Sequence, residues 1–288
     1  MLLVGLPGCG PAHPAARRLT ELGALPGTMS MPPPWDLADP SVVVLTGTGP
    51  PGGTGLPGLH LVIGTGAGPD TDVVLDGPPG QIDELWAGRL VPFEANLRAG
   101  RRAPRRDHPR LLVPDPGWPD QAGRLIGRFR SSVGHQVIRV DHIGSTSVPG
   151  LPAKELIDIQ VVVGGLGTAR QVAGAARRAG FVHVPGQWFG TDRHGSDHPE
   201  EVVVDADPGR PVNINIRPAG APIWRESLLF RDWLRRHEAE RDAYAAMKQE
   251  LAGRPGMHVD DYSVAKMPWI STALTRAGDW AAATGWSP

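Results

Sequence analysis

Residues 142–159 combine side chains that could hold phosphate groups and a divalent cation. Gly144 and Ser145 follow an apolar run typical of a strand, and Asp158 stands on the next predicted strand, after a loop. Amides and a hydroxyl at Gly-Ser can donate to phosphate oxygens, and a carboxylate on the adjacent strand can hold Mg²⁺. We therefore predict a nucleotide site with Asp158 as its catalytic residue and with five phosphate-contacting residues, Gly144, Ser145, Ser147, Lys154 and Lys266.

The predicted cation site lacks one of the two carboxylates that a two-metal site would have. Gln160 stands two positions after Asp158, and side chains two apart on a strand share a face. Two-metal phosphoryl transfer uses carboxylates at such positions, whereas Gln160 offers only an uncharged carboxamide oxygen. We predict a weak Mg²⁺ site formed by Asp158 and Gln160, with ATP or another nucleotide as the ligand.

A second glycine loop lies near the amino terminus. Gly5 and Gly10 have the spacing of the phosphate-binding loop GxxxxGK[ST], which needs a lysine for the phosphates and a hydroxyl for Mg²⁺. Pro11 and Ala12 occupy those two positions, and proline also removes a backbone N–H. We predict a degenerate loop made of Gly5, Gly10, Pro11 and Ala12 that does not support kinase chemistry.

The elements around this first loop follow an α/β pattern. Short apolar runs typical of buried parallel strands lie at residues 2–4, 42–45, 59–63 and 73–75. Helices are predicted at 15–23 and at 81–102, the second with an interruption at Pro92. The stretch 26–40 holds too many prolines for a helix. The pattern predicts a truncated, doubly wound domain over residues 1–103.

The second half predicts a mixed sheet flanked by helices, over residues 117–288. Strands are expected at 136–143, 156–163, 202–205 and 212–216, and helices at 169–179, 223–236, 239–251 and 263–277. Asp120 is predicted to cap a further helix that carries Leu125, Phe129 and Val133. Residues 104–116 are interpreted as a linker. A basic run from the end of the preceding helix into this linker could contact phosphates, but a solvated helix end and linker is preferred: Arg98, Arg101, Arg102, Arg105, Arg106 and Arg110.

Other polar and aromatic residues are given structural interpretations. Asp141 is expected to cap a strand, with a stray carboxylate at the site as the alternative. Three tryptophans, Trp188, Trp224 and Trp233, could stack on a base, but core packing is preferred. A glycine-rich region has metal-ligand residue types without regular spacing and is interpreted as a solvated loop: His183, Asp192, His194, Asp197 and His198.

Composition narrows the range of partners. The net charge of the 288 residues is −1, so no global field favours nucleic acid or an anionic membrane. The single cysteine, Cys9, excludes an internal disulfide, and no apolar run reaches about 18 residues. We expect a cytoplasmic protein with a nucleotide or small-molecule ligand, no membrane or nucleic-acid partner, and room for a protein partner.

Two known families are similar to parts of the chain. The segments 142–159, 208–216, 229–235, 244–248 and 262–266 resemble, in order, the GrpB family, which implies a nucleotidyltransferase-like fold. Residues 16–24 and 89–97 resemble the first and last helices of dephospho-coenzyme A kinases, whose loop lysine and hydroxyl are catalytic. A kinase domain followed by a GrpB domain is a known actinobacterial arrangement.

These resemblances leave three functions to compare. The preferred one is a nucleotide-binding or accessory protein, with a folding or partner role and little turnover. The alternative is an active Mg²⁺-dependent nucleotidyltransferase that transfers a nucleoside monophosphate, as the intact Gly144-Ser145 and Asp158 would suggest. The third, a dephospho-coenzyme A kinase of coenzyme A biosynthesis, conflicts with Pro11 and Ala12.

Overall fold

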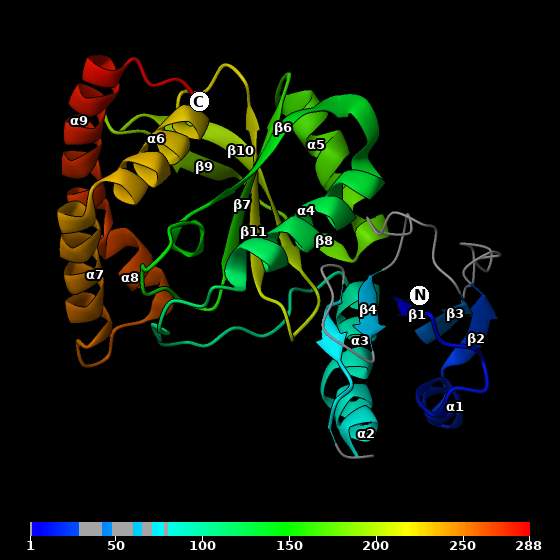
Figure 1. The fold of residues 1–288 in the computed structure, drawn as a ribbon. Coiled ribbons are helices and arrows are strands. Elements are labelled where there is room, and N and C mark those ends of the chain that lie inside the picture. The colour runs from blue at the N-terminus through cyan, green and yellow to red at the C-terminus, as the bar shows by residue number, and fades with distance from the viewer. Residues whose placement is uncertain (1, 29–41, 48–59, 65–70, 78–79) are drawn as a thin grey trace.

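The computed structural model describes residues 2–28, 42–47, 60–64, 71–77 and 80–288, which form two sheets with their helices (Figure 1). The first sheet is parallel, in the order β2-β3-β1-β4-β5. Its strands are β1 Leu2–Pro7, β2 Leu25–Thr28, β3 Val42–Gly47, β4 Leu61–Gly64 and β5 Val73–Val74. The predicted parallel α/β architecture is therefore confirmed. Residue 59 of one predicted strand, and residues 29–40 of the proline-rich stretch, lie outside the described ranges.

Strand β2 was not predicted, because Leu25–Thr28 contains a proline and a glycine. It lies at the edge of the sheet and pairs with β3 alone. An edge strand tolerates proline because one side of its backbone needs no partner.

The helical stretch after β5 is continuous through Pro92 but changes its winding. Helix α2 (Gln81–Leu85) leads into a π-helical turn, η1 (Trp86–Leu90), and then into α3 (Val91–Ala99). The wider turn makes room for the proline ring, which would otherwise meet the carbonyl one turn earlier. Gly100 then ends α3 in the left-handed conformation, with φ 61°.

The second sheet is mixed, in the order β6-β7-β11-β10-β8, with β9 paired to β10. Only β7 and β11 run parallel. Its strands are β6 Val137–Ile143, β7 Ile157–Val163, β8 Phe181–His183, β9 Trp188–Thr191, β10 Asp197–Asp205 and β11 Val212–Pro218.

Residues alternate between the two faces of this sheet. Apolar residues such as Ile159 and Ile214 face α4 (Trp118–Val133) and α5 (Leu166–Ala175), and together they form the main core. A 3-10 turn, Ala176–Ala179, extends α5. The polar residues of β7 and β11 share the opposite face: Asp158, Gln160, Asn213, Asn215 and Arg217.

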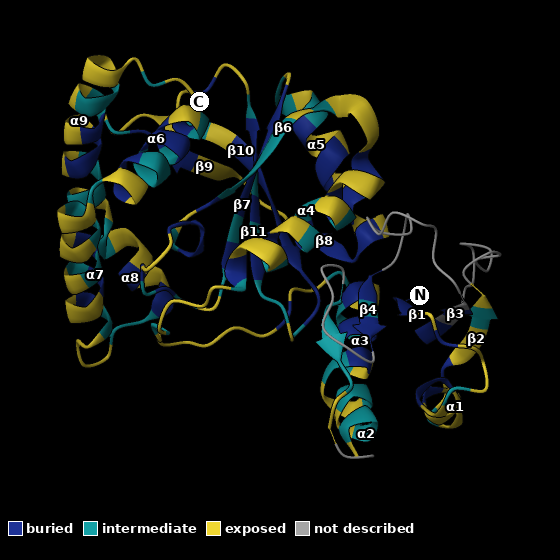
Figure 2. Ribbon diagram, in the orientation of Figure 1, coloured by how far each residue is buried: buried dark blue, intermediate teal, exposed yellow. Residues whose placement is uncertain are grey.

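The carboxy-terminal helices form a layer of their own beside the sheet (Figure 1). They are α6 Ile223–Arg236, α7 Glu238–Ala252, α8 Val259–Ala265 and α9 Met267–Thr284. The helix predicted at 263–277 is thus two helices, which meet at Lys266. Figure 2 shows the central strands buried and the outer faces of α7 and α9 exposed. No helix within the described ranges is long and apolar enough to cross a membrane.

Three local predictions are corrected. Asp120 does not cap α4, because the helix begins at Trp118, before it, and Asp120 lies in the first turn. Asp141 is no strand cap, since it lies within β6 and binds Arg139 at 2.8 Å. The region interpreted as a solvated loop contains β8 and the β9–β10 hairpin. There Asp192 accepts from two backbone amides and contacts His198 Nε2 at 2.9 Å.

The two sheets share one hydrophobic core. Phe93 and Leu97 of α3 belong to the same buried cluster as Val182, Val202 and Val204 of β8 and β10. Arg89 reinforces this contact with a bidentate bond to Asp207, at 2.8 and 2.6 Å. Because the cluster crosses from one sheet to the other, residues 1–103 do not complete their core alone.

Candidate functional site

Gly144 places the loop after β6 directly over Asp158. The antiparallel pairing of β6 and β7 sets Ile143 opposite Asp158, so the chain turns at the next residue. Gly144 has φ 70°, and a β-carbon there would lie 2.5 Å from Asp158 Oδ2. Only glycine fits this conformation and this close approach. The glycine of the predicted Gly-Ser pair is thus required by its contact with the acid.

A cavity of about 470 Å³ opens beside Asp158 on the polar face of the second sheet. The chain has only three lysines and two tyrosines. All three lysines and one tyrosine line this cavity: Lys154, Lys248, Lys266 and Tyr262. The other tyrosine, Tyr244, lies beneath Lys248, with Nζ 4.8 Å from the ring centroid. The cavity therefore gathers three lysines around Asp158, while the second carboxylate of its lining, Asp260, is paired with Arg105 at 2.7 Å. This arrangement suits an anionic ligand.

The lysine ammonium groups are held over aromatic rings. Lys266 Nζ lies 4.8 Å and Lys154 Nζ 5.5 Å from the centroid of the Tyr262 ring. Such cation–π contacts stabilise a partly desolvated cation by about 0.5–2 kcal/mol. Helices α7 and α8 thus contribute lysine and tyrosine side chains to the site, which β6 and β7 do not contain.

Ser145 joins the loop to α7. Lys248 Nζ donates to Ser145 Oγ at 3.1 Å and also to the carbonyl oxygen of Pro152. Lys248 is 1% exposed. Ser145 is therefore held by a buried residue that lies about a hundred positions later in the sequence.

Burial shifts the protonation of the charged groups at this site. Burial, with Lys266 and Lys154 nearby, lowers the pKa of Lys248 to about 7. Burial also lowers the pKa of Lys266 to about 8 and the pKa of Lys154 below its usual range. For Asp158, burial raises the pKa although Lys154 and Lys266 oppose the shift. An anionic ligand would favour the charged form of each lysine.

The predicted phosphate-contacting residues do not all reach the cavity. It is lined by Ser145, Lys154, Asp158 and Lys266, but not by Gly144 or Ser147. Gly144 lines a second, mostly apolar cavity of about 240 Å³, on the other side of Ser145 and Asp158. Ser147 is buried, and its hydroxyl donates to the Gly144 carbonyl at 2.6 Å. That bond closes the loop from within.

Gln160 belongs to a separate buried network. Its Oε1 accepts from Arg217 at 3.0 Å, and its Nε2 donates to the Trp224 carbonyl at 3.1 Å and to Asp141 at 3.3 Å. Gln160 is fully buried and lines neither cavity. Arg217 in turn binds Glu200 at 2.8 Å. The carboxamide of Gln160 thus forms hydrogen bonds with the polar groups around it. Asp158, two residues earlier on β7, faces the cavity instead.

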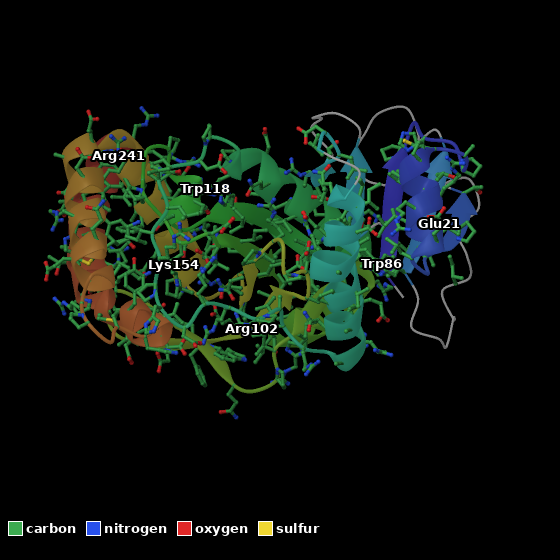
Figure 3. The ribbon with its side chains drawn as sticks, turned by 90° about the horizontal axis from the view of Figure 1, so that it is seen from below. Glu21, Trp86, Arg102, Trp118, Lys154 and Arg241 are labelled. Atoms are coloured by element: carbon green, nitrogen blue, oxygen red, sulfur yellow. The ribbon has the colours of Figure 1, made fainter. Side chains whose placement is uncertain are left out.

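Residues from outside the motif complete the rim. Arg102 and Arg105 line the same cavity, so two arginines of the basic run are not merely solvated. Figure 3 shows Arg102 and Lys154 in the middle of the molecule, between the carboxy-terminal helices and the amino-terminal part. Trp188 also lines the cavity and is 41% exposed, unlike Trp233, which packs in the core at 2%. Trp224 lies at the Gln160 network, with its indole N–H bonded to Ala219.

The amino-terminal loop has a different geometry. Gly5 lies within β1, paired with Leu45 and Val62. Gly10, Pro11 and Ala12 form an exposed turn, and α1 (Pro14–Glu21) starts with a second proline. The turn offers few free amides, and it lines neither of the two cavities at Asp158.

The donor set for a metal ion is small. Within the described residues, no group of three or more His, Cys, Asp and Glu side chains could hold a metal. Asp158, hydrogen-bonded by the Asn213 side chain, is the acid that faces the lysine-lined cavity from β7. One carboxylate suits a single Mg²⁺ that takes its other ligands from phosphates and water.

Sequence reasoning missed Lys248, Tyr244 and Tyr262 as site residues. Their rarity was the available signal, because arginine supplies nearly all other cations of the chain. When a chain has so few lysines and tyrosines, the positions that have them are candidates for a specific chemical role. The structure places those few positions together.

Comparisons with known proteins place most of this chain in a family. The family description "GrpB protein" matches residues 108–276. A UPF0157 protein of Halalkalibacterium halodurans is 31% identical over 200 residues, which cover 68% of this chain and 90% of that protein. The crystal structure of conserved protein GrpB from Enterococcus faecalis superposes with a TM-score of 0.48 at 22% identity, covering 58% of this chain and 98% of the other.

The chain is also similar to dephospho-CoA kinases. That of Mycolicibacterium paratuberculosis is 38% identical over 240 residues, which cover 75% of this chain and 58% of that protein. That of Mycobacterium tuberculosis is 38% identical over 224 residues, covering 71% and 54%. The chain thus spans little more than half the length of these relatives. Through the match of residues 108–276, which include every lysine and tyrosine of the site, the chain belongs to the GrpB family.

Proposed function

We propose that this GrpB-family protein binds a nucleotide, or a similar phosphorylated small molecule, in the cavity beside Asp158, with little or no nucleotidyl transfer. The observation that carries the proposal is the convergence of Lys154, Lys248 and Lys266 on one cavity. Arg102 adds a further cation at the rim, while Arg105 lines the same cavity and is paired with Asp260 at 2.7 Å. A ligand with two or three phosphates would meet this charge, and 470 Å³ lies within the usual range of small-molecule sites.

The rim of the cavity offers an aromatic surface for a nucleobase beside the phosphates. Trp188 is a half-exposed aromatic side chain next to a cationic cavity, and its indole N–H is anchored to the Val184 carbonyl at 3.1 Å. A fixed aromatic ring offers a stacking surface to any nucleobase, worth about 1–3 kcal/mol. The arrangement therefore favours a nucleotide over a simple polyphosphate.

The active-transferase alternative has weaker support. Two-metal transfer needs at least two acids around the reacting phosphate, and Gln160 is bound to Arg217 instead of facing the cavity. Mg²⁺ would be held by Asp158 and by phosphate oxygens of the ligand. Its positive charge would add to the charge that the lysines already provide. We propose that Mg²⁺ changes the affinity by less than about tenfold.

The amino-terminal part is proposed to act as a cover for the second sheet, within the boundaries 1–103, 104–116 and 117–288. Its helix α3 buries part of β8 and β10, and Arg89 binds Asp207. Pro11 and Ala12 stand where the kinase loop needs a lysine and a hydroxyl. We propose that the chain does not phosphorylate dephospho-coenzyme A. ATP-dependent formation of coenzyme A by the purified chain would contradict this.

Isothermal titration with ATP, GTP and tripolyphosphate, each with Mg²⁺ and with EDTA, tests the binding proposal. We expect ATP to bind in the high micromolar range or more weakly, and Lys154→Met and Lys266→Met each to weaken binding about tenfold or more, as for a charge-assisted contact. Arg254→Met, which removes an exposed cation from the far end of α7, is the matched control. No ATP binding at millimolar concentration, or equal binding by all variants, would overturn the proposal.

A further inference from the structure

Lys248 has the surroundings of a neutral amine. The residue is 1% exposed, and its Nζ pairs with no carboxylate of the described part of the chain. Lys154, from the loop before β7, and Lys266, at the start of α9, face it with like charge. Tyr244 lies on its own helix, while Tyr262 and Asp260 of α8 and Asp158 of β7 face the other two lysines. Burial and repulsion thus act together against a charged Lys248.

A neutral Lys248 completes a consistent chain of hydrogen bonds. The charged amine donates to both Ser145 Oγ and the Pro152 carbonyl. An uncharged amine has two N–H groups and one lone pair, so on loss of its proton Nζ can keep its bond to Pro152 and accept from the Ser145 hydroxyl across the same 3.1 Å contact. Burial raises the pKa of Tyr244, which keeps its phenol protonated and uncharged beside Ser145. The Ser145 hydroxyl would then give its proton to the neutral amine of Lys248.

The choice of lysine at this position has a chemical reason. Arginine stays protonated in proteins, whereas a buried lysine can lose its proton near neutral pH. The chain uses arginine for nearly all its other cations, as in the Arg89–Asp207 and Arg217–Glu200 pairs. A buried lysine without a carboxylate partner, as at position 248, therefore suits a role in which the side chain is a neutral amine.

We propose that Ser145 is an activated nucleophile and that Lys248 is its general base, so that the site can react with an activated phosphoryl ester or anhydride. The Oγ–P bond forms, the bond from phosphorus to the leaving group breaks, and the Ser145 proton passes to Lys248 Nζ. Ser145 lines both cavities, so a substrate in either one would lie against this residue. The inference goes beyond the proposed binding function and does not depend on a nucleotide as the natural ligand.

A fluorescent fluorophosphonate tests the dyad in the full-length chain, because it phosphonylates activated serines with loss of fluoride. We expect one labelled peptide, containing Ser145, and a labelling rate that rises through about pH 7 as Lys248 loses its proton. Ser145→Ala should abolish labelling. Lys248→Met should slow it by about a hundredfold and flatten the pH profile.

Two further variants separate the base from a structural role. Lys248→Arg keeps a cation and hydrogen bonds at the site but cannot supply a base, so its labelling should stay slow at every pH. Ser263→Ala is the matched control, since this cavity-wall hydroxyl donates to the Val259 carbonyl, and labelling should be unchanged. The proposal is overturned if the parent is not labelled, if Ser145→Ala is labelled, or if Lys248→Met or Lys248→Arg matches the parent rate.

Discussion

The backbone at Gly144 lies against the carboxylate of Asp158, so closely that a β-carbon at position 144 would be 2.5 Å from Oδ2 and 2.8 Å from Cβ of that acid. This contact joins the end of β6 to β7 and sets the position of Ser145 relative to the cavity. It also explains why a glycine precedes the serine, independently of any phosphate.

Gly144→Ala should therefore cost more stability than its backbone conformation alone requires. Gly134 is a matched control, because its φ of 64° is similar and a β-carbon there meets nothing within 4 Å. Urea unfolding should show a loss of about 1–3 kcal/mol for Gly134→Ala and at least about 1 kcal/mol more for Gly144→Ala. Equal losses would mean that Asp158 moves aside freely.

Trp188→Ala should weaken nucleotide binding without changing phosphate binding. Loss of a stacking surface should cost about 1–3 kcal/mol with ATP and nothing with tripolyphosphate. Phe189→Ala is the control, since the neighbouring ring is 49% exposed but lines neither cavity at Asp158. Titration of both ligands against both variants measures the difference. A similar loss for ATP and tripolyphosphate would assign Trp188 a structural role.

Lys248→Met should change how stability depends on pH. Burial lowers the pKa of Lys248 to about 7 in the folded chain, against an ordinary value of 10.5 for lysine. The folded state thus binds fewer protons between these values, and the parent gains stability as pH rises from about 7 to 10.5. Lys248→Met lacks this gain. The difference between the two free energies of unfolding, variant minus parent, should therefore fall by a few kcal/mol over this window. Urea unfolding at several pH values measures it, and a constant difference would show that Lys248 stays charged.

Gln160→Glu should destabilise the fold and should not create a metal site. The variant would remove the N–H donors to Asp141 and Trp224 and bring two carboxylates together in a buried network. We expect a loss of about 1–3 kcal/mol and no gain in Mg²⁺-dependent ATP affinity. Gln249→Glu, at an exposed position of α7, should be nearly neutral. Tighter Mg²⁺-dependent binding would return Gln160 to the site.

Arg89→Leu should loosen the two sheets from each other. It would leave Asp207, with a side chain 1% exposed, without its bidentate partner, and breaking such a buried pair costs about 3–5 kcal/mol. Arg18→Leu breaks the exposed Arg18–Asp83 pair and should cost much less stability, because water screens exposed ion pairs. Urea unfolding and limited proteolysis compare the two. Equal effects would mean that the Asp207 contact contributes little.

The strands and helices were largely predictable because their signals are local. The alternation of apolar and polar residues in β7 and β11 marks a sheet with one buried and one polar face. The strands β2 and β9 were missed because proline and glycine in short segments resemble turns, while pairing with a neighbour decides the conformation. The helix predicted over 263–277 was likewise cut at Lys266.

For the site, the sequence by itself determined the loop and the acid, since Gly144, Ser145 and Asp158 lie within one segment joined by two paired strands. Only the tertiary structure decided the rest. Lys248 reaches Ser145 through the packing of α7, Trp188 comes from β9, and Arg102 comes from the segment that follows α3. Gln160 stands two residues from Asp158, yet Arg217 and Asp141 hold it in another network. Spacing fixes which residues share a strand face, but the bonds of each side chain depend on partners that are distant in sequence.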